Sequence, residues 1–328
     1  MKLGVMRVVW GLISGVFGLI TLIGMVARLL PAALSDLPLL PEIVSFTPWY
    51  CISGAIALFA ALMAHQTLRV WTMVICLALN VCMQVPLFAH IGVPQQSAQQ
   101  SSSNQTLSVM TSNVYRGAGS VQDIVQQVRQ HHVQILTMQE TTADFEQKLY
   151  DAGLDQLLPY HHRSTSDHMY GNDIWSAYPL ADVVSDEVDS SASPMPAGSI
   201  TLDSGAVVRF VSVHTTSPKF GSWAQWKRSI DEISALQNNT HTTYVLMGDF
   251  NATLDHAPFR AMLGSRFRDG AYQLAHGYTM TWPANLSIPA MVGIDHVVVD
   301  QGITVTSMQT QTITGSDHKA LIATLRIA

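Results

Sequence analysis

The apolar residues of this chain are concentrated in its first ninety positions. Three runs there carry no charge, at residues 8–27, 44–64 and 70–88, and they contain 20, 21 and 19 residues. A helix of about 20 residues crosses roughly 30 Å of hydrocarbon. The pattern therefore predicts three transmembrane helices within residues 1–92. A cleavable signal peptide is the alternative for the first run, but this run is long for one and two further runs follow it.

Basic residues in short loops indicate how the predicted helices are oriented. Lys2 and Arg7 precede the first run, and Arg69 lies in the short connection between the second and third. The connection after the first run holds one base, Arg28, and two acids. Because basic loops tend to stay in the cytoplasm, the N-terminus is predicted to be cytoplasmic. Three crossings then place everything after residue 90 outside, as in an integral protein of a bacterial inner membrane that faces the periplasm or the cell exterior.

A polar tract separates the apolar region from the remainder of the chain. The sequence QQSAQQSSSNQ at 95–105 has no apolar face and so nothing to bury. It predicts a flexible linker over residues 93–106. The chain is thereby divided into a membrane region at 1–92, this linker and a polar domain at 107–328.

The polar domain shows short apolar runs between polar turns. Runs of strand length begin near residues 107, 133, 207, 243, 294 and 320 and are rich in Val, Ile, Leu and Thr. Helical spacing of apolar residues occurs at 121–130 and 221–236. In the second of these helices, we interpret Trp223 and Trp226 as core packing. Strands with interspersed helices predict an α/β domain.

Charge and cysteine content indicate which kinds of metal site and ligand this domain is not expected to have. Beyond residue 100 the chain carries 13 basic and 21 acidic residues, a formal net charge of −8. All three cysteines lie in the apolar region, so neither a disulfide framework nor a cysteine zinc site is expected in the polar domain. Duplex nucleic acid is bound largely through basic contacts to phosphates, which the acidic balance does not favour.

Polar side chains recur where the apolar runs end. The members of this set are Asn113, Glu140, His214, Asp249, Asn251, Asp295, Asp317 and His318. Strand ends that meet at one edge of a sheet bring distant residues into one cleft. Oxygen ligands of this kind suit Mg²⁺, or Mn²⁺, and thirteen histidines keep zinc open as the alternative. A histidine paired with a carboxylate, such as His318 with Asp295 or His214 with another acid, could activate water.

Six segments, taken together and in order, resemble the signature motifs of the endonuclease/exonuclease/phosphatase superfamily. They are MTSNVYRG (110–117), TMQE (137–140), VSVHTTSP (211–218), MGDFNAT (247–253), GIDHVVV (293–299) and GSDHKAL (315–321), and GNDIWSAYPL (171–180) matches more loosely. The resemblance covers roughly residues 107–328. It implies a four-layer α/β sandwich, in which two packed β-sheets are flanked by helices.

The resemblance also implies a role for each motif residue. Glu140 is the principal metal ligand, with Asn113 and Asp317 beside it. The other roles follow in order: Asp249 and Asn251 polarise the attacking water and hold the phosphate, His214 contacts a phosphoryl oxygen, and His318, oriented by Asp295, acts as general base or as phosphate-stabilising acid. Tyr115 and Arg116 are expected to face solvent.

These inferences predict a magnesium-dependent hydrolase of phosphate mono- or diesters at the extracytoplasmic membrane face. Membrane lipids are the expected partners, with a lipid-linked or small-molecule phosphate ester as substrate, and no protein partner is inferred. One alternative is a membrane-anchored nuclease acting on extracytoplasmic DNA or RNA. The other is a non-catalytic membrane binding module, which the complete set of motifs disfavours.

Overall fold

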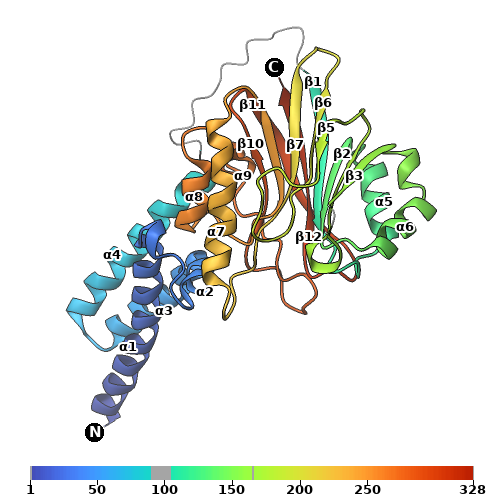
Figure 1. The fold of residues 1–328 in the computed structure, drawn as a ribbon. Helices are drawn as coiled ribbons and strands as arrows, with labels where there is room; N and C mark the ends of the chain where they lie inside the picture. The colour runs from blue at the N-terminus through green and yellow to red at the C-terminus, as the bar shows by residue number, and fades with distance from the viewer. Residues whose placement is uncertain (1, 90–104, 165, 328) are drawn as a thin grey trace.

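The computed structural model describes residues 2–89, 105–164 and 166–327, which form a helical region and a β-sandwich (Figure 1). The predicted linker at 93–106 lies almost wholly outside the described residues, and the first strand begins at Gln105. The helical region consists of α1 (Lys2–Leu29), η1 (Ala32–Leu34), α2 (Leu40–Ser45), η2 (Thr47–Trp49), α3 (Tyr50–Met63), α4 (Thr67–Gln84) and η3 (Val85–Leu87).

Two of these helices are long and apolar enough to cross a membrane, by length and composition. They cover Gly4–Leu29 and Thr67–Leu87, whereas the intervening apolar segment Thr47–Met63 is shorter. The second predicted span, 44–64, is therefore not one helix. The chain turns at Phe46, between α2 and η2, where the backbone has φ −93° and ψ 13°, and Pro48 has no backbone N–H with which to continue the hydrogen bonding of α2. Asn80 of α4 donates to the Thr47 carbonyl at 2.9 Å.

The sandwich contains two six-stranded sheets. The first has the order β11-β12-β1-β2-β4-β3 and the second β5-β6-β7-β8-β10-β9. The strands are β1 (Gln105–Asn113), β2 (Ile135–Gln139), β3 (Tyr160–Arg163), β4 (Asn172–Ser176), β5 (Ala181–Val184), β6 (Ala197–Thr201), β7 (Val207–His214), β8 (Tyr244–Asp249), β9 (Arg268–Asp269), β10 (Asp295–Val299), β11 (Ile303–Thr312) and β12 (Lys319–Ile327). The central pairs β1–β2 and β7–β8 are parallel.

The two sheets face each other, and helices cover their outer faces (Figure 1). The helices are α5 (Val121–Gln130) and α6 (Ala143–Asp151) on the first sheet, and α7 (Trp223–Ile233) and α8 (Ala257–Leu263) on the second; α9 (Gly270–Leu274) and the short turns η4 (Leu154–Gln156), η5 (His168–Tyr170) and η6 (Ser234–Asn238) complete the domain. Successive residues of a strand face opposite sides. Val109 accordingly joins the core between the sheets, whereas its neighbour Met110 packs towards α5 and α6. The predicted four-layer α/β sandwich is confirmed.

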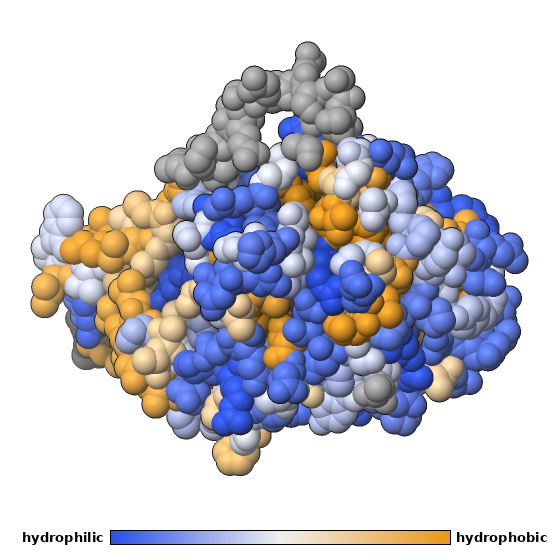
Figure 2. Space-filling view, turned by 45° about the horizontal axis from the view of Figure 1, so that its top comes forward, coloured by the Kyte–Doolittle hydropathy of each residue, from blue (hydrophilic) through white to orange (hydrophobic). Residues whose placement is uncertain are grey.

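The helical region packs directly on the sandwich through buried polar contacts. Arg28, in the last turn of α1, donates to Asp255 at 2.6 Å, and both side chains are largely buried. Gln84 of α4 also donates to Asp255, at 3.3 Å. His256 and the Pro41 carbonyl lie 2.9 Å apart. Hydrophobic residues gather most densely over the side of the molecule where the helical region lies (Figure 2).

Two tryptophans extend this interface. Trp49 donates to the Met291 carbonyl at 2.8 Å, and Trp223 donates to the Glu42 carboxylate at 2.8 and 3.1 Å. The interpretation of the aromatic pair on α7 as core packing holds for Trp226, which is fully buried. It does not hold for Trp223, which reaches across to α2.

Candidate active site

Sheet register brings the predicted site residues to one edge of the sandwich. In the second sheet, Asp249 on β8 pairs with His214 on β7 and with Asp295 on β10. In the first sheet, Asn113 on β1 pairs with Gln139, the residue before Glu140. The remaining residues Asn251, Asp317 and His318 lie in the loops next to β8 and β12. All eight residues therefore converge, although more than 200 positions separate the first from the last.

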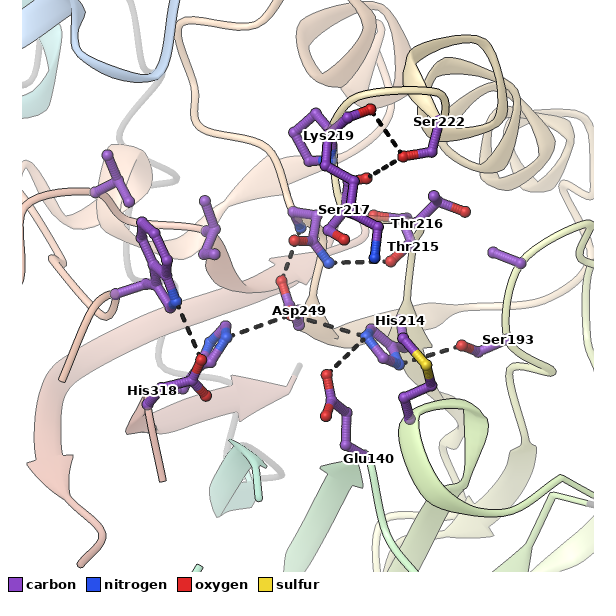
Figure 3. A pocket seen from close by; sticks show the side chains of 18 of the residues that line it. Glu140, Ser193, His214, Thr215, Thr216, Ser217, Lys219, Ser222, Asp249 and His318 are labelled. Carbon is purple, nitrogen blue, oxygen red and sulfur yellow. Dashed lines mark hydrogen bonds and ion pairs between the residues drawn. The ribbon is translucent and has the colours of Figure 1, made fainter. Parts of the chain in front are cut away.

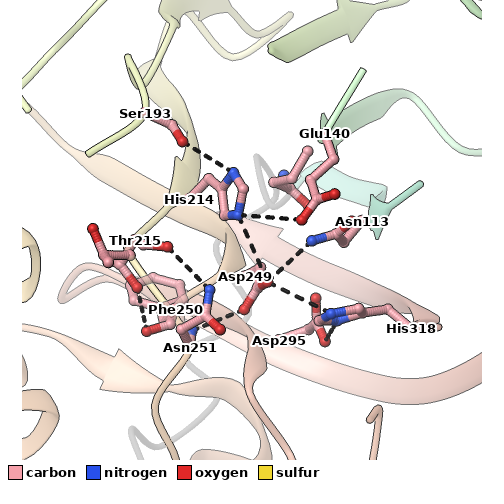
Figure 4. Close-up of polar contacts among 12 residues, drawn as sticks. Asn113, Glu140, Ser193, His214, Thr215, Asp249, Phe250, Asn251, Asp295 and His318 are labelled. Atoms are coloured by element: carbon pink, nitrogen blue, oxygen red, sulfur yellow. Dashed lines mark hydrogen bonds and ion pairs between the residues drawn. The ribbon is translucent and has the colours of Figure 1, made fainter. Parts of the chain in front are cut away.

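Asp249 lies at the centre of the cluster (Figure 4). Its Oδ2 accepts from Asn113 Nδ2 at 3.0 Å, and its Oδ1 accepts from the Asn251 backbone at 2.8 Å. The Nε2 atoms of His214 and His318 lie 3.9 and 3.7 Å from its Oδ2. Burial raises the pKa of Asp249, against the opposing effect of the His318 charge. The carboxylate is thus held in place by two hydrogen bonds and can accept a proton.

His318 forms a buried pair with Asp295. Its Nδ1 lies 2.9 Å from Asp295 Oδ2, so this nitrogen carries the proton and Nε2 points towards Asp249. Burial alone would lower the pKa of His318, but Asp295 and Asp249 outweigh it and raise the pKa to about 10. The imidazole is therefore a cation at neutral pH and can stabilise negative charge or donate a proton.

The pKa of His214 is shifted in the opposite direction from that of His318. Its Nδ1 is hydrogen-bonded to Ser193 Oγ at 3.2 Å, and its Nε2 lies 4.0 Å from Glu140 Oε1. Burial and the charge of His318 lower the pKa of His214 to about 4. The ring is therefore neutral at pH 7. A neutral histidine, His214, and a cationic one, His318, therefore lie on either side of the Asp249 carboxylate.

Glu140 follows β2 in a left-handed backbone conformation, with φ of 60°. The next residue fixes this turn: Thr141 donates from its backbone to the Gly171 carbonyl at 3.0 Å and from its hydroxyl to Asp173 at 2.8 Å. Gly171 must be glycine, because a Cβ there would lie 2.1 Å from the Thr141 carbonyl oxygen. Glu140 is thereby directed into the cleft from a fixed backbone position.

The Glu140 carboxylate is only partly compensated by protein cations. Its Oε2 is buried and has no hydrogen-bond partner among the described residues. Burial raises its pKa, and this effect exceeds the opposing effects of the His318 charge and of Arg116, which lies 4.0 Å away on a side chain that is 58% exposed. Asp295 Oδ1 is also unpartnered, but that group faces a cationic histidine. A carboxylate oxygen that is buried without a partner is costly, so Glu140 fits a site for an added cation.

A second group of potential ligands is less suitable for a metal. Ligand atoms of Asp249, Asp295 and His318 lie within 4.8 Å of one another. However, His318 and Asp295 already share a hydrogen bond, and Asp249 accepts from Asn113. Asn113 Oδ1 in turn accepts from the Tyr115 backbone, and Asp317 Oδ2 from Trp282 at 3.3 Å. In contrast, Glu140 Oε2 accepts no hydrogen bond among the described residues. Glu140 is therefore the better primary ligand for a hard divalent cation, and Asn113 and Asp317 lie close enough to influence its pKa.

The cluster forms the floor of a cleft of about 560 Å³ (Figure 3). Tyr115 and Arg116 line this cleft, so they border the site as well as facing solvent. Three further lining residues, Glu42, Ser45 and Phe46, come from the helical region. Lys219 contributes an exposed cation from the loop after β7.

Sequence patterns missed several residues that support the site. Ser193 orients His214, and Trp282 contacts Asp317, yet neither lies in a motif or at the end of an apolar run. The Thr281 hydroxyl accepts from the Asp295 backbone at 3.4 Å. The segment 281–293 carries no periodicity that would have indicated these contacts. For Lys219, the one signal in the sequence is the polar character of the loop at residues 215–222, after His214.

Comparison with known proteins agrees with this geometry. The model of the endonuclease/exonuclease/phosphatase family matches residues 110–318, more than half of the chain. Comparison with curated proteins finds no match. A solved member of the family from Bacteroides thetaiotaomicron has 16% identity and a TM-score of 0.51, over 69% of this chain and 99% of that one.

Two further solved structures share the fold. TDP2 from D. rerio, crystallised with a single-strand DNA product, has 16% identity and a TM-score of 0.55, over 67% of this chain and 99% of its own. A mannosyl-6-phosphatase from Bacteroides thetaiotaomicron has 17% identity and a TM-score of 0.51, with the same coverage of 67% and 99%. The sandwich has the fold of enzymes that hydrolyse phosphate esters, and by the extent of the family match the chain belongs to the endonuclease/exonuclease/phosphatase family.

Proposed function

We propose that this chain is a divalent-metal-dependent phosphoesterase whose substrate is a phosphate ester carried by a membrane-associated molecule. The observation that carries the proposal is the buried Glu140 Oε2, which has no hydrogen-bond partner among the described residues and shares one cleft with Asp249 and the His318–Asp295 pair. This combination offers a cation site, a proton acceptor and a protonated imidazole at one point. Phosphate ester hydrolysis needs these three functions.

Glu140, Asp317 and Asn113 would hold the cation, with Mg²⁺ preferred and Mn²⁺ as the alternative. When bound, the cation supplies positive charge against the phosphoryl oxygens. The remaining steps belong to the protein's own residues. Asp249 accepts the proton of the attacking water while the Asn251 backbone and Asn113 hold its carboxylate in position.

The two histidines have different roles because they carry different charges. His318, kept protonated by Asp295, faces the phosphoryl group as a cation and donates a hydrogen bond from Nε2. His214 is neutral, and when Ser193 donates to its Nδ1, its Nε2 proton is free to bind a phosphoryl oxygen. As the water oxygen bonds to phosphorus, the ester P–O bond breaks, and Asp249 takes the proton of the water as the base. His318 is the stabilising acid, whose Nε2 proton can go to the departing oxygen.

Membrane attachment is supported by the exposed apolar surface of the helices. In both span-length helices only 28% of the most apolar window is buried, so most of that surface has no protein cover among the described residues. Arg28 and Gln84, at the carboxyl ends of α1 and α4, both contact Asp255. The opposite end of the bundle is marked by Arg69, which donates to the Gly11 carbonyl. The sandwich would thus lie at one membrane face and Arg69 at the other.

We extend the proposal to three spans, with α3 as the short one. Arg7 and Arg69 would lie in the cytoplasm, and the sandwich outside it, in the periplasm or at the cell exterior for a bacterial inner membrane. The cleft then opens beside the bilayer, because α2 at the membrane-proximal end lines it. A membrane-borne phosphate ester is the substrate class that this placement favours, and the net charge of −8 beyond residue 100 argues against nucleic acid.

The test is a release assay with the full-length protein in lipid vesicles and added Mg²⁺. Substrates are a set of lipid phosphates and phosphodiesters, soluble sugar phosphates, and single- and double-stranded DNA. Glu140→Gln, prepared identically, controls for contaminating phosphatases. We expect release from at least one lipid substrate by the wild type alone. Efficient cleavage of DNA with no release from any lipid would establish the nuclease alternative instead.

A further inference from the structure

The catalytic cleft has one wall that does not come from the sandwich. Glu42, Ser45 and Phe46 line it together with the catalytic cluster, and all three belong to residues 40–49, which we call the connector wall. These residues span α2 and η2. The sandwich alone therefore encloses only part of the cleft.

The connector wall is fixed in place by three separate segments of the sandwich domain. His256, after β8, contacts the Pro41 carbonyl at 2.9 Å. Trp223, at the start of α7, holds the Glu42 carboxylate, and Trp49 donates to the Met291 carbonyl ahead of β10. Ser222, beside Trp223, and Val292, beside Met291, also line the cleft. The wall is therefore a built part of the site.

The two sides of the cleft differ in chemistry. Glu140, His214, Asp249 and His318 form its polar floor. Besides this floor, the apolar side chains of Phe46, Trp282, Val292 and Ile294 line the cleft, together with the polar Glu42 and Ser45 of the connector wall. Val292 is adjacent in sequence to Met291, whose carbonyl accepts from Trp49, so this part of the apolar lining lies close to the helical region.

Exposed apolar residues continue from the wall towards the helices. Phe46 is 36% exposed, and Leu37 and Leu39, which precede α2, are 45% and 59% exposed. Such residues are unfavourable in water but suit the boundary of a bilayer. An apolar chain that leaves the membrane at this point would meet Phe46 before its phosphate reached the catalytic floor.

From this arrangement we infer that the connector wall determines substrate specificity by binding the hydrocarbon next to the phosphate of an amphiphilic ester. Phe46 makes the contact, and Glu42 positions the wall through Trp223. The helical region is then a part of the active site in addition to an anchor. This inference rests on the proposed phosphoesterase function.

The test compares two chromogenic diesters that differ only in chain length, methyl 4-nitrophenyl phosphate and dodecyl 4-nitrophenyl phosphate. The full-length protein is assayed in lipid nanodiscs with Mg²⁺, and kcat/KM is measured for each probe. We expect the wild type to prefer the dodecyl probe. Phe46→Ala should reduce the dodecyl-to-methyl ratio of kcat/KM at least tenfold, and Phe46→Leu, which keeps an apolar side chain, should restore most of it.

Phe59→Ala provides the matched control. Phe59 lies on α3, is 56% exposed and does not line the cleft, so this variant should keep the wild-type ratio. An unchanged ratio in Phe46→Ala, or an equal preference of the wild type for both probes, would overturn the inference while leaving the phosphoesterase function standing. Failure of the wild type to hydrolyse either these diesters or the corresponding monoesters would overturn both proposals.

Discussion

Asp173 is a buried acid whose ionisation should make stability depend on pH. It lies on β4 with a fully buried side chain. Its Oδ1 accepts from Thr141 and lies 3.8 Å from Arg163 Nε, and its Oδ2 has no hydrogen-bond partner among the described residues. Burial is the largest influence on its pKa, which rises from 3.8 to about 7. Replacing this acid with an amide, in Asp173→Asn, removes the titration and retains an oxygen that can accept from Thr141.

The sign and size of the effect follow from linkage. Because the folded state binds the proton more tightly, stability falls as pH rises between 3.8 and about 7. The full rise in the pKa corresponds to a loss of about 4 kcal/mol in the free energy of unfolding, at about 1.36 kcal/mol for each pKa unit. About 3 kcal/mol of this loss occurs between pH 5 and pH 8. Asp173→Asn has no carboxyl group at this position, so its free energy of unfolding does not fall with pH for this reason. Relative to the wild type, its free energy of unfolding should therefore increase by about 3 kcal/mol between pH 5 and pH 8.

Thermal unfolding of both proteins in the same detergent at pH 5, 6, 7 and 8 measures the difference. For a domain of this size, about 3 kcal/mol corresponds to a relative shift in Tm of roughly 6–12 °C. Asp203→Asn is the control, because this exposed carboxylate should change stability by no more than about 0.5 kcal/mol. A Tm difference between Asp173→Asn and the wild type that is the same at pH 5 and pH 8 would refute the assignment of a raised pKa to Asp173.

Further predictions concern the metal, the acid, the interface and the topology. Glu140→Gln should abolish phosphoesterase activity without lowering Tm, and EDTA should do the same reversibly; activity that persists in EDTA would exclude a required metal. His318→Ala should lower kcat at least roughly 10²-fold, the scale of general acid–base effects, and a smaller loss would remove it from the mechanism. Asp255→Ala should destabilise the protein by about 3 kcal/mol in thermal unfolding, because it leaves a buried arginine unpaired; no change would mean that the helical region does not dock as described. An alkaline phosphatase reporter fused after residue 105 should be active, and one fused within 65–69 inactive, whereas the reverse pattern would invert the proposed orientation.

Local patterns in the sequence were sufficient to predict those helices and strands of the sandwich that are both buried and regular. Residues 121–130 were predicted as a helix and form α5 with the same bounds, because Ser120 caps its first turn and its apolar residues recur on one face. The core strands β1, β7, β8, β10 and β12 were evident from apolar runs. By contrast, β5 is a short edge strand that is exposed along its whole length, and β11 exposes much of its surface at a sheet edge. Such strands are held by backbone pairing, which leaves no pattern of side chains.

The candidate catalytic residues were also accessible from the sequence. Each lies at the end of a strand, and strand ends of an α/β sandwich meet at one edge. The identities of these residues and their order along the chain are local features. Their charge states are not: His214 and His318 are both buried histidines, yet one is neutral and the other cationic because only His318 lies against Asp295.

Only the tertiary structure showed that the helical region completes the cleft. The contact between Trp223 and Glu42 joins residues 181 positions apart, and that between Arg28 and Asp255 joins residues 227 apart. In the sequence, Glu42 is one of two acids in a loop, and Phe46 is one apolar residue within a predicted span. Hydrophobic periodicity records which face of a segment is buried, but it carries no information about which distant segment covers that face. The contribution of the connector wall to the cleft therefore became visible only when α2, α7 and the loop before β10 were placed side by side.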